Sequence, residues 1–516
     1  MKFVFATFSD LMSYPASMLA HLAQSHGWDV DIIFISDTAD DAEIATQLED
    51  CAPDMLALTL KTFERPLAIR TARVAKSMNI KVIAGGPHPT AVPPDLGRTG
   101  YFDAVVSGDG AGVLPDILDG YKWLDNELIV GKRHKDPLVY LNRFFSERQE
   151  EQIRKTRRID VFTAHGCPYQ CHFCGTARKV VVIPQAKVMD DLEHLVDAYG
   201  VKWIMLHDDT FTYSKKRVRE YRTLIQERGL DFRHNVFARV DCFDEEIADE
   251  LLMMGVDDVT FGVETPTQRM MDFLKKDTTV EQAYEAARVC REKEIAFKTN
   301  LMFGIPTQTE EDYRAAVDFV REAKPNRISC FFYVPLPGTV LYDYCVDKGH
   351  LPEDFTYDDF RDIGNDGEFL GWSATPGILK GVDYELGARY IEMTKEADDK
   401  NNGRTQLIMD TAEQANQGKW LIIGGRPYFY WVLSQVSKKK WDNLLGYINI
   451  FEEEFSFDKP FEISIDEISW DKDAAPPETV VTTFHKGPYF YDSLIPMLKE
   501  KYGYDGPVLS VGTHVA

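Results

Sequence analysis

Three cysteines stand close together in the segment HGCPYQCHFC, and they are Cys167, Cys171 and Cys174. The segment follows an apolar run that begins at Asp160, so the cysteines are expected in a loop directly after a strand. Three thiolates at this spacing can converge on one metal centre. They are one fewer than the four that normally close an iron–sulfur cube or a structural zinc site. Either one metal position stays open to a substrate, or His165 or His172 supplies a fourth ligand to zinc.

The elements that must position this loop alternate between strand and helix. From Asp160 onward, apolar strand-like segments recur about six times with helical segments between them, and they are DVFTAHGC, WIMLHDD, HNVFARV, DVTFGVE, FKTNLMFG and ISCFFYV. This spacing predicts a partial (β/α)6 TIM-like barrel over residues 159–360, with its chemistry at the carboxyl ends of the strands. A cysteine loop at the mouth of a barrel, and not between two short hairpins, favours the open cluster over zinc.

An earlier series of short strands and helices covers residues 1–120 and predicts a Rossmann-like, doubly wound parallel sheet. A charged stretch without clear period, residues 121–158, is expected to link it to the barrel. From residue 361 to 516 the regular alternation stops and aromatic residues become frequent. We expect an α+β C-terminal domain there that closes the barrel mouth and selects the substrate, with the aromatic segment Tyr428–Trp431 as one candidate contact.

Two loops rich in glycine follow strands of the first domain, KVIAGGPHPTAVPP and VVSGDGAG. Both are expected at the carboxyl edge of the sheet, where doubly wound folds bind their ligands. By themselves these loops indicate a nucleotide-like or cofactor site. The candidate binding residues are Gly85, Gly86, His88, Ser107, Gly108 and Gly110.

The composition narrows the class of partner. The formal net charge is -25, from 83 acidic and 58 basic residues, and such an excess repels phosphate backbones, so we expect no nucleic-acid partner. The first residues do not have the pattern of a signal peptide, and no apolar stretch is long enough to span a bilayer. We therefore expect a cytoplasmic protein, in which the 8 cysteines stay reduced and free to bind metal.

The cysteine segment CPYQCHFC resembles the signature loop of the radical S-adenosylmethionine (radical SAM) superfamily, and the similarity extends from about Asp160 to Tyr344. The resemblance implies that the three cysteines hold a [4Fe-4S] cluster, that S-adenosylmethionine caps the fourth iron, and that its reductive cleavage yields a 5′-deoxyadenosyl radical. It also implies a set of downstream residues at the S-adenosylmethionine site. They are Asp209 and Glu264 as acceptors for an amine or ribose, Arg239 as partner of a carboxylate, and Gly304 with Pro306 beside adenine.

The first domain is similar to the cobalamin-binding domain that precedes the barrel in one radical SAM subfamily, and GGPHPT is its most characteristic piece. That subfamily includes cobalamin-dependent methyltransferases and the anaerobic magnesium-protoporphyrin ester cyclase. The familiar D-x-H-x-x-G element is missing, because His88 is followed by Pro89 and Thr90 without the required glycine. Cobalt would then lack a protein histidine. In VSGDGAG, Asp109 stands where relatives often carry glutamate, so a degenerate domain without cobalamin stays an alternative.

Together these resemblances predict methyl transfer to an unactivated carbon, or to phosphorus, of a small molecule, with a flavodoxin or ferredoxin as reductant. The alternatives are a radical cyclisation, oxidation or rearrangement without methyl transfer, and a non-catalytic cobalamin or metal sensor. The remaining cysteines, at positions 51, 242, 290, 330 and 345, have no metal-binding spacing. A second cluster is not expected, which argues against methylthiolation. The sequence names neither the substrate nor a catalytic residue.

Overall fold

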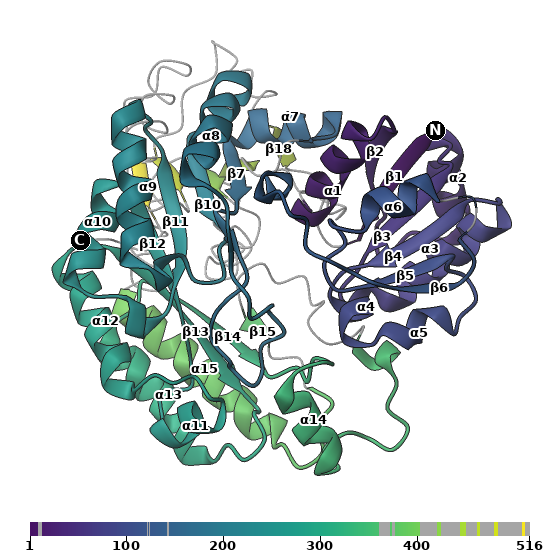
Figure 1. Ribbon diagram of the computed structural model, residues 1–516. Helices are drawn as coiled ribbons and strands as arrows, with labels where there is room; N and C mark the ends of the chain where they lie inside the picture. Colours follow the sequence, from purple (N-terminus) through teal and green to yellow (C-terminus); the bar gives the residue numbers. More distant parts are fainter. Residues whose placement is uncertain are drawn as a thin grey trace.

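The structure is a computed structural model. It describes residues 1–8, 13–120, 122, 124–141, 144–360, 372–373 and 377–402, and five strands between residues 420 and 510. Figure 1 shows the N-terminal domain, in purple and blue, beside the teal strands and helices of the barrel. None of the described helices combines the length and apolar composition that crossing a bilayer requires.

The N-terminal domain is a six-stranded parallel sheet in the order β2-β1-β3-β4-β5-β6, which confirms the Rossmann-like prediction. Its strands are β1 (Lys2–Thr7), β2 (Asp29–Phe34), β3 (Met55–Thr59), β4 (Lys81–Gly85), β5 (Ala104–Ser107) and β6 (Glu127–Val130). Its helices are α1 (Tyr14–Ser25), α2 (Asp41–Cys51), α3 (Arg65–Ser77), α4 (Pro87–Ala91), α5 (Pro93–Gly97) and α6 (Leu114–Asp119). Strand β6 extends the sheet past residue 120, where we expected the domain to end.

Both faces of this sheet are covered, as in doubly wound folds. On β1, Phe3 and Phe5 pack in the apolar cluster that includes α1, whereas Val4 and Ala6 pack in the cluster that includes α2 and α3. This is why β1 reads as an uninterrupted apolar run. The strand order reverses between β1 and β3, and such a switch point opens a ligand crevice at the carboxyl ends of the strands.

The barrel is a parallel sheet in the order β15-β14-β13-β12-β11-β10-β7, open between β7 and β15, so the partial barrel is confirmed. Its strands are β7 (Arg158–Val161), β10 (Trp203–Leu206), β11 (Arg233–Ala238), β12 (Val256–Glu264), β13 (Ala296–Phe303), β14 (Arg327–Phe332) and β15 (Trp372–Ser373). Its helices are α8 (Gln185–Tyr199), α9 (Lys215–Arg228), α10 (Glu245–Met253), α11 (Gln268–Phe273), α12 (Val280–Glu292), α13 (Glu310–Ala323) and α14 (Val340–Asp347).

Residues alternate between the two faces of the barrel strands. On β10, Ile204 and Leu206 are fully buried in the core that includes Val188 and Leu192 of α8. Met205 lies between them and is only half-buried, on the concave face. The helices therefore cover the convex face (Figure 1), and the concave face is left to hold ligands.

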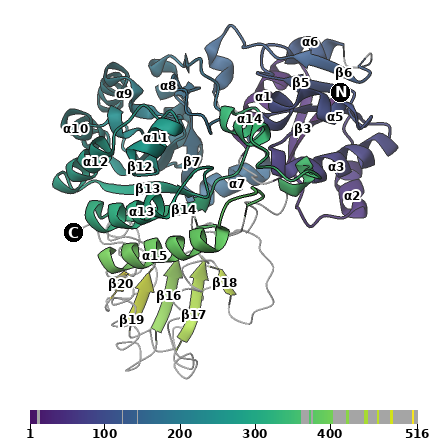
Figure 2. The same ribbon diagram turned by 90° about the horizontal axis from the view of Figure 1, so that it is seen from below.

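Helix α15 (Tyr384–Asn402) packs against α13 and β14 and lies between the barrel and a third sheet (Figure 2). The strands of this sheet are β16 (Trp420–Gly424), β17 (Leu444–Asn449), β18 (Glu462–Ser464), β19 (Thr479–Thr482) and β20 (Val508–Ser510). Their order is β18-β17-β16-β19-β20, and each described pairing is parallel. The described part of residues 361–516 thus contains a helix and a parallel sheet, and the expected α+β class of the whole region stays a prediction. The segment Tyr428–Trp431 lies outside the described residues.

Candidate functional site

The cysteine loop leaves the barrel sheet after β7 and is closed at its neck by a short antiparallel pair, β8 (Ala164–His165) and β9 (Val181–Val182). Within the neck the backbone N–H of Cys167 donates to the carbonyl of Ala177 at 2.9 Å. Gly166 has φ +90°, and a Cβ there would lie 2.6 Å from the carbonyl oxygen of Lys179. Only glycine fits where the two chain segments of the neck cross. In the sequence HGC, the neck therefore requires Gly166, and the metal site requires the thiol of Cys167.

Each of the three sulfur atoms has one polar neighbour from the protein. The backbone N–H of Thr176 donates to Cys174 Sγ at 3.5 Å, and Cys167 Sγ lies 3.7 Å from the hydroxyl of Thr210. Cys171 is buried and accepts a hydrogen bond from Arg239 Nη1 at 3.6 Å. Burial raises the pKa of the Cys171 thiol, while Lys276 and Arg239 act in the opposite direction.

These residues fit an iron–sulfur cube. In the described part of the chain, no three His, Cys, Asp or Glu side chains are placed to bind one common ion, and a cube does not need this because each cysteine ligates a different iron. The zinc alternative does need it. Its two candidate histidines have other partners, since His165 Nε2 lies 3.0 Å from the hydroxyl of Tyr14 and His172 Nδ1 lies 2.8 Å from the carbonyl oxygen of Phe273.

Two charged side chains hold the shape of the loop. Asp209 is exposed and accepts from the N–H of Gly166 at 3.1 Å and from the hydroxyl of Thr176 at 3.0 Å, on either side of the three cysteines. Arg178 donates to the carbonyl oxygens of Tyr169, Cys171 and Cys174 at 2.6, 3.1 and 2.8 Å. The sequence placed Asp209 at the S-adenosylmethionine amine, and here its carboxylate ties the cysteine loop.

A buried ion pair behind the loop was not anticipated. Asp208 is 2% exposed and accepts from the N–H groups of Thr163 and Ala164 at 2.6 and 3.0 Å. Arg217 of α9, also buried, donates to the same carboxylate. The pair fixes the chain just before the cysteines. The only sequence signal is the doublet of aspartates in HDD, which does not tell the buried one from the exposed one.

Glu264 ends β12 in a left-handed conformation, with φ +67°, beside a register shift in its pairing with β13. The side chain is buried, and Oε1 lies 3.8 Å from Nζ of Lys276. Oε2 is buried without a hydrogen-bond partner in the structure. Burial raises the pKa of this carboxyl, and Lys276 partly offsets the rise. An orphaned acceptor at the carboxyl end of a barrel strand suits a ligand that carries N–H or O–H groups.

Gly304 and Pro306 follow β13 at the same end of the barrel. Gly304 has φ +70°, and a Cβ would lie 3.0 Å from the ring of Phe332. The side chain of Gln308 closes this turn, because it accepts from the N–H of Ile305 at 2.9 Å and donates to the carbonyl of Met302 at 3.1 Å. The turn is therefore rigid, and Pro306 is buried within it.

In the N-terminal domain, the loops after β4 and β5 lie side by side. The hydroxyl of Thr90 donates to the carbonyl of Gly86 at 2.8 Å and accepts from the N–H of Gly108 at 3.0 Å. Gly86 has φ +106°, and a Cβ would lie 2.9 Å from the backbone nitrogen of Leu60. Gly85 and Ser107 end the two strands, and Gly110 follows in the second loop.

His88 occupies an interior position below these loops. It is fully buried, with Nδ1 3.3 Å from the hydroxyl of Thr62 and Nε2 3.0 Å from the carboxylate of Asp95. Arg65 binds the same carboxylate and reaches Asp358, which lies between β14 and β15 of the barrel. Burial acts to raise the pKa of Asp95, but the hydrogen bonds from His88 and Arg65 hold it at about 2.

The carboxyl edges of the two domains meet. A Cβ on Gly338, in the loop after β14, would lie 3.0 Å from Cβ of Ala91 in α4. The barrel also carries a pair that the sequence did not single out, His207 and Asp160, with Nε2 and Oδ2 3.2 Å apart and both side chains 39% exposed. The ring of Phe162 lies beside His207, with centroids 5.6 Å apart.

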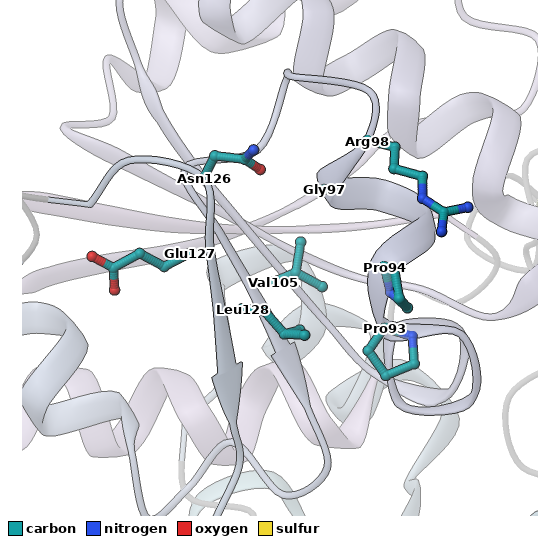
Figure 3. A pocket seen from close by; sticks show the side chains of 8 residues that line it. All are labelled: Pro93, Pro94, Gly97, Arg98, Val105, Asn126, Glu127 and Leu128. Atoms are coloured by element: carbon teal, nitrogen blue, oxygen red, sulfur yellow. The ribbon is translucent and has the colours of Figure 1, made fainter.

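A cavity of about 280 Å³ lies elsewhere, against α5 and the amino end of β6 (Figure 3). Pro93, Pro94 and Leu128 line it, together with Arg98 and Asn126. It is smaller than most ligand pockets, which span roughly 300–1,000 Å³, and it is remote from the carboxyl ends of the strands. We assign it no ligand.

Comparison with known families agrees with this geometry. Residues 161–320 match the radical SAM superfamily, and residues 3–118 match the B12 binding domain. The barrel and its cysteine loop therefore define a radical SAM enzyme, a class whose cofactors are a [4Fe-4S] cluster and S-adenosylmethionine. With the B12-binding domain in front of the barrel, the chain belongs to the cobalamin-binding group of the radical SAM superfamily.

The chain is similar to curated proteins and to solved structures. An uncharacterized methyltransferase of Pyrococcus horikoshii is 27% identical over 369 residues, which are 65% of this chain and 80% of that protein. The anaerobic magnesium-protoporphyrin IX monomethyl ester cyclase of Rubrivivax gelatinosus is 24% identical over 65% of this chain and 67% of its own length. The radical S-adenosylmethionine methyltransferase TsrM of Kitasatospora setae has the same fold, with a TM-score of 0.56 and 18% identity over 67% of this chain and 77% of TsrM.

Proposed function

We propose that this protein is a cobalamin-dependent radical SAM methyltransferase that acts on a small molecule. The main support for the proposal is that the carboxyl end of the barrel meets the carboxyl end of the N-terminal sheet. The barrel end carries three thiols that each have a polar neighbour, and the end of the N-terminal sheet carries two glycine loops joined by a hydrogen bond. When bound, the cluster would supply one-electron reduction of S-adenosylmethionine, and cobalamin would supply a methyl carrier. The source of the electron would be a flavodoxin or a ferredoxin.

In this proposal the chain's own residues bind and orient the cluster and S-adenosylmethionine. Cys167, Cys171 and Cys174 ligate three irons. Glu264 offers the free Oε2 to an amine or ribose hydroxyl of S-adenosylmethionine. The turn at Gly304 and Pro306 places rigid backbone beside adenine.

On the other edge, Gly85, Gly86, Ser107, Gly108 and Gly110 allow close backbone approach to the corrin ring, and His88 supports them from below. The concave barrel face would receive the substrate.

The test is anaerobic reconstitution of the full-length protein with iron and sulfide in the presence of hydroxocobalamin. Wild type should bind about four irons and one cobalamin per chain. After reduction, S-adenosylmethionine with a labelled methyl group should yield labelled methylcobalamin and 5′-deoxyadenosine. Alanine in place of Cys167, Cys171 or Cys174 should abolish iron binding and leave cobalamin bound. Cys290→Ala, which alters a buried thiol of α12, is the matched control.

Other results would contradict the proposal. Zinc in place of iron would exclude radical chemistry. A cluster without cobalamin, or 5′-deoxyadenosine without any methylcobalamin, would favour the second candidate, a radical cyclisation or oxidation. That candidate has support from the similarity to the protoporphyrin ester cyclase. Cobalamin binding without 5′-deoxyadenosine would indicate a sensor.

A further inference from the structure

Arg239 is a charged group that contacts the sulfur of a cluster cysteine, and the protein fixes it from several sides. It follows β11 and is 7% exposed. Nε and Nη2 donate to the two carboxylate oxygens of Asp241 at 2.9 and 3.2 Å, and Nη2 also donates to the carbonyl of Lys276 at 2.5 Å. The guanidinium carbon lies 3.6 Å from the ring centre of Tyr169, which belongs to the cysteine loop.

The donor that remains, Nη1, points at Cys171 Sγ at 3.6 Å. Tyr169 is itself held, because its hydroxyl lies 2.8 Å from the sulfur of Cys242. Turning the guanidinium toward a substrate carboxylate would break its bonds to Asp241 and Lys276 in a buried place, where an unpaired polar group is costly. From the sequence we expected Arg239 to pair with the carboxylate of S-adenosylmethionine. The side chain is instead held with its guanidinium toward Asp241, Lys276 and Cys171.

A cationic N–H donor on a cluster sulfur has a defined chemical consequence. Reduction adds one electron from the external donor to the cluster, and no bond is made or broken. The reduced cluster carries more negative charge on its sulfur ligands, so a hydrogen bond from a cation stabilises it more than the oxidised cluster. Hydrogen bonds to the sulfurs and nearby charge are known determinants of cluster potentials.

We propose that Arg239 is a positioning residue that raises the reduction potential of the iron–sulfur cluster by holding Nη1–H on the sulfur of Cys171. Asp241 sets the orientation of the guanidinium and at the same time weakens its field. The inference rests only on the cluster part of the proposed function, and it needs neither cobalamin nor methyl transfer. The effect is relevant to turnover because a weaker one-electron donor can reduce a cluster whose reduction potential is less negative.

The experiment is a redox titration of the reconstituted full-length protein, followed by the EPR signal of the reduced cluster. Arg239→Gln and Arg239→Lys should both shift the midpoint potential to more negative values, with the larger shift for glutamine because the charge is also lost. Asp241→Asn keeps the arginine and removes the compensating charge, so it should shift the potential in the opposite direction. A residue that only supports the fold would not give shifts of opposite sign.

The control is Arg222→Lys, which makes the same exchange in a partly buried arginine of α9 that pairs with Glu250 of α10, away from the sulfurs. Its potential should equal that of wild type. The inference is overturned if Arg239→Gln binds a full cluster with an unchanged midpoint potential, or if Asp241→Asn shifts the potential negatively. If the Arg239 variants bind no iron, the sign of the Asp241→Asn shift decides alone. Absence of a cluster in wild type would instead refute the proposed function itself.

Discussion

The hydroxyl of Tyr14 lies 3.0 Å from Nε2 of His165, and this contact joins the N-terminal domain to the base of the cysteine loop. Tyr14 begins α1, after the loop that follows β1, and His165 ends β8, two residues before Cys167. Tyr14 and His165 also pack on the ring of Phe162, with centroid distances of 4.2 and 4.9 Å. A change at the carboxyl edge of the N-terminal sheet can thus reach the cysteine loop through this side-chain pair.

Tyr14→Phe tests this connection. Phenylalanine keeps the packing on Phe162 and removes one hydrogen bond, a loss of about 1 kcal/mol. Hydrogen exchange of the amides in Ala164–His165 should then be roughly fivefold faster in the apo-protein, while exchange in the far strands of the barrel stays unchanged. Tyr101→Phe, in the N-terminal domain but on its other side, should have no effect on these amides. An equal acceleration in both variants would refute the connection.

His88 should not ligate cobalt, because both of its ring nitrogens already have protein partners. We expect the EPR spectrum of protein-bound cob(II)alamin to lack the splitting from an axial histidine nitrogen. His88→Gln should leave this spectrum unchanged. The same substitution should lower the stability of the N-terminal domain, because Asp95 loses a buried partner. A spectrum with axial nitrogen splitting that His88→Gln removes would show that the histidine turns out of its network on binding.

Asp209 ties the two ends of the cysteine loop, so its removal should impair cluster assembly and not only S-adenosylmethionine binding. Asp209→Ala loses both hydrogen bonds and should retain less iron per chain after reconstitution. Asp209→Asn keeps an acceptor oxygen and should be intermediate. Asp231→Ala, an exposed aspartate in the turn before β11, is the control and should assemble normally. Full iron in Asp209→Ala, together with weakened S-adenosylmethionine binding, would instead support the role inferred from the sequence.

Much of this architecture could be predicted from the sequence, because the patterns that indicate it are local. Strands such as β3 are buried on both faces and therefore appear as continuous apolar runs, and the cysteine spacing needs no tertiary information. Strand β6 was missed because it sits in a charged stretch at the edge of the sheet, with Leu128 and Val130 exposed. Nothing in its sequence distinguishes it from a linker.

The directions of side chains were not readable, since they depend on contacts between distant segments. Asp208 and Asp209 are neighbours of the same type, and only the alternation at the end of β10 turns one into the core and the other to the loop. Arg239 is directed at Cys171 by Tyr169, Asp241 and Lys276, which come together only in the folded barrel. The sequence therefore indicated candidate residues but not the contacts that their side chains make.

His234 of β11 should make the apo-protein sensitive to acid. It is fully buried between Tyr221 and Phe232, and burial lowers its pKa from 6.5 to about 4. The unfolded chain binds this proton more readily than the folded one, so the stability contribution is present above pH 6.5 and is lost as the pH falls toward 4. Between pH 7 and pH 5 the loss should be about 2 kcal/mol. Urea unfolding at the two pH values measures it.

The comparison that isolates this effect is His234→Phe, which keeps an aromatic ring in the same contacts and cannot titrate. Phenylalanine gives up the 3.3 Å contact with the hydroxyl of Tyr221, so the variant should be less stable than wild type at pH 7. Between pH 7 and pH 5, however, the free energy of unfolding of this variant should fall by about 2 kcal/mol less than that of wild type. His194→Gln, on the exposed side of α8, should retain the wild-type pH dependence. An identical pH dependence in wild type and His234→Phe would mean that His234 is already protonated, or solvated, in the folded barrel.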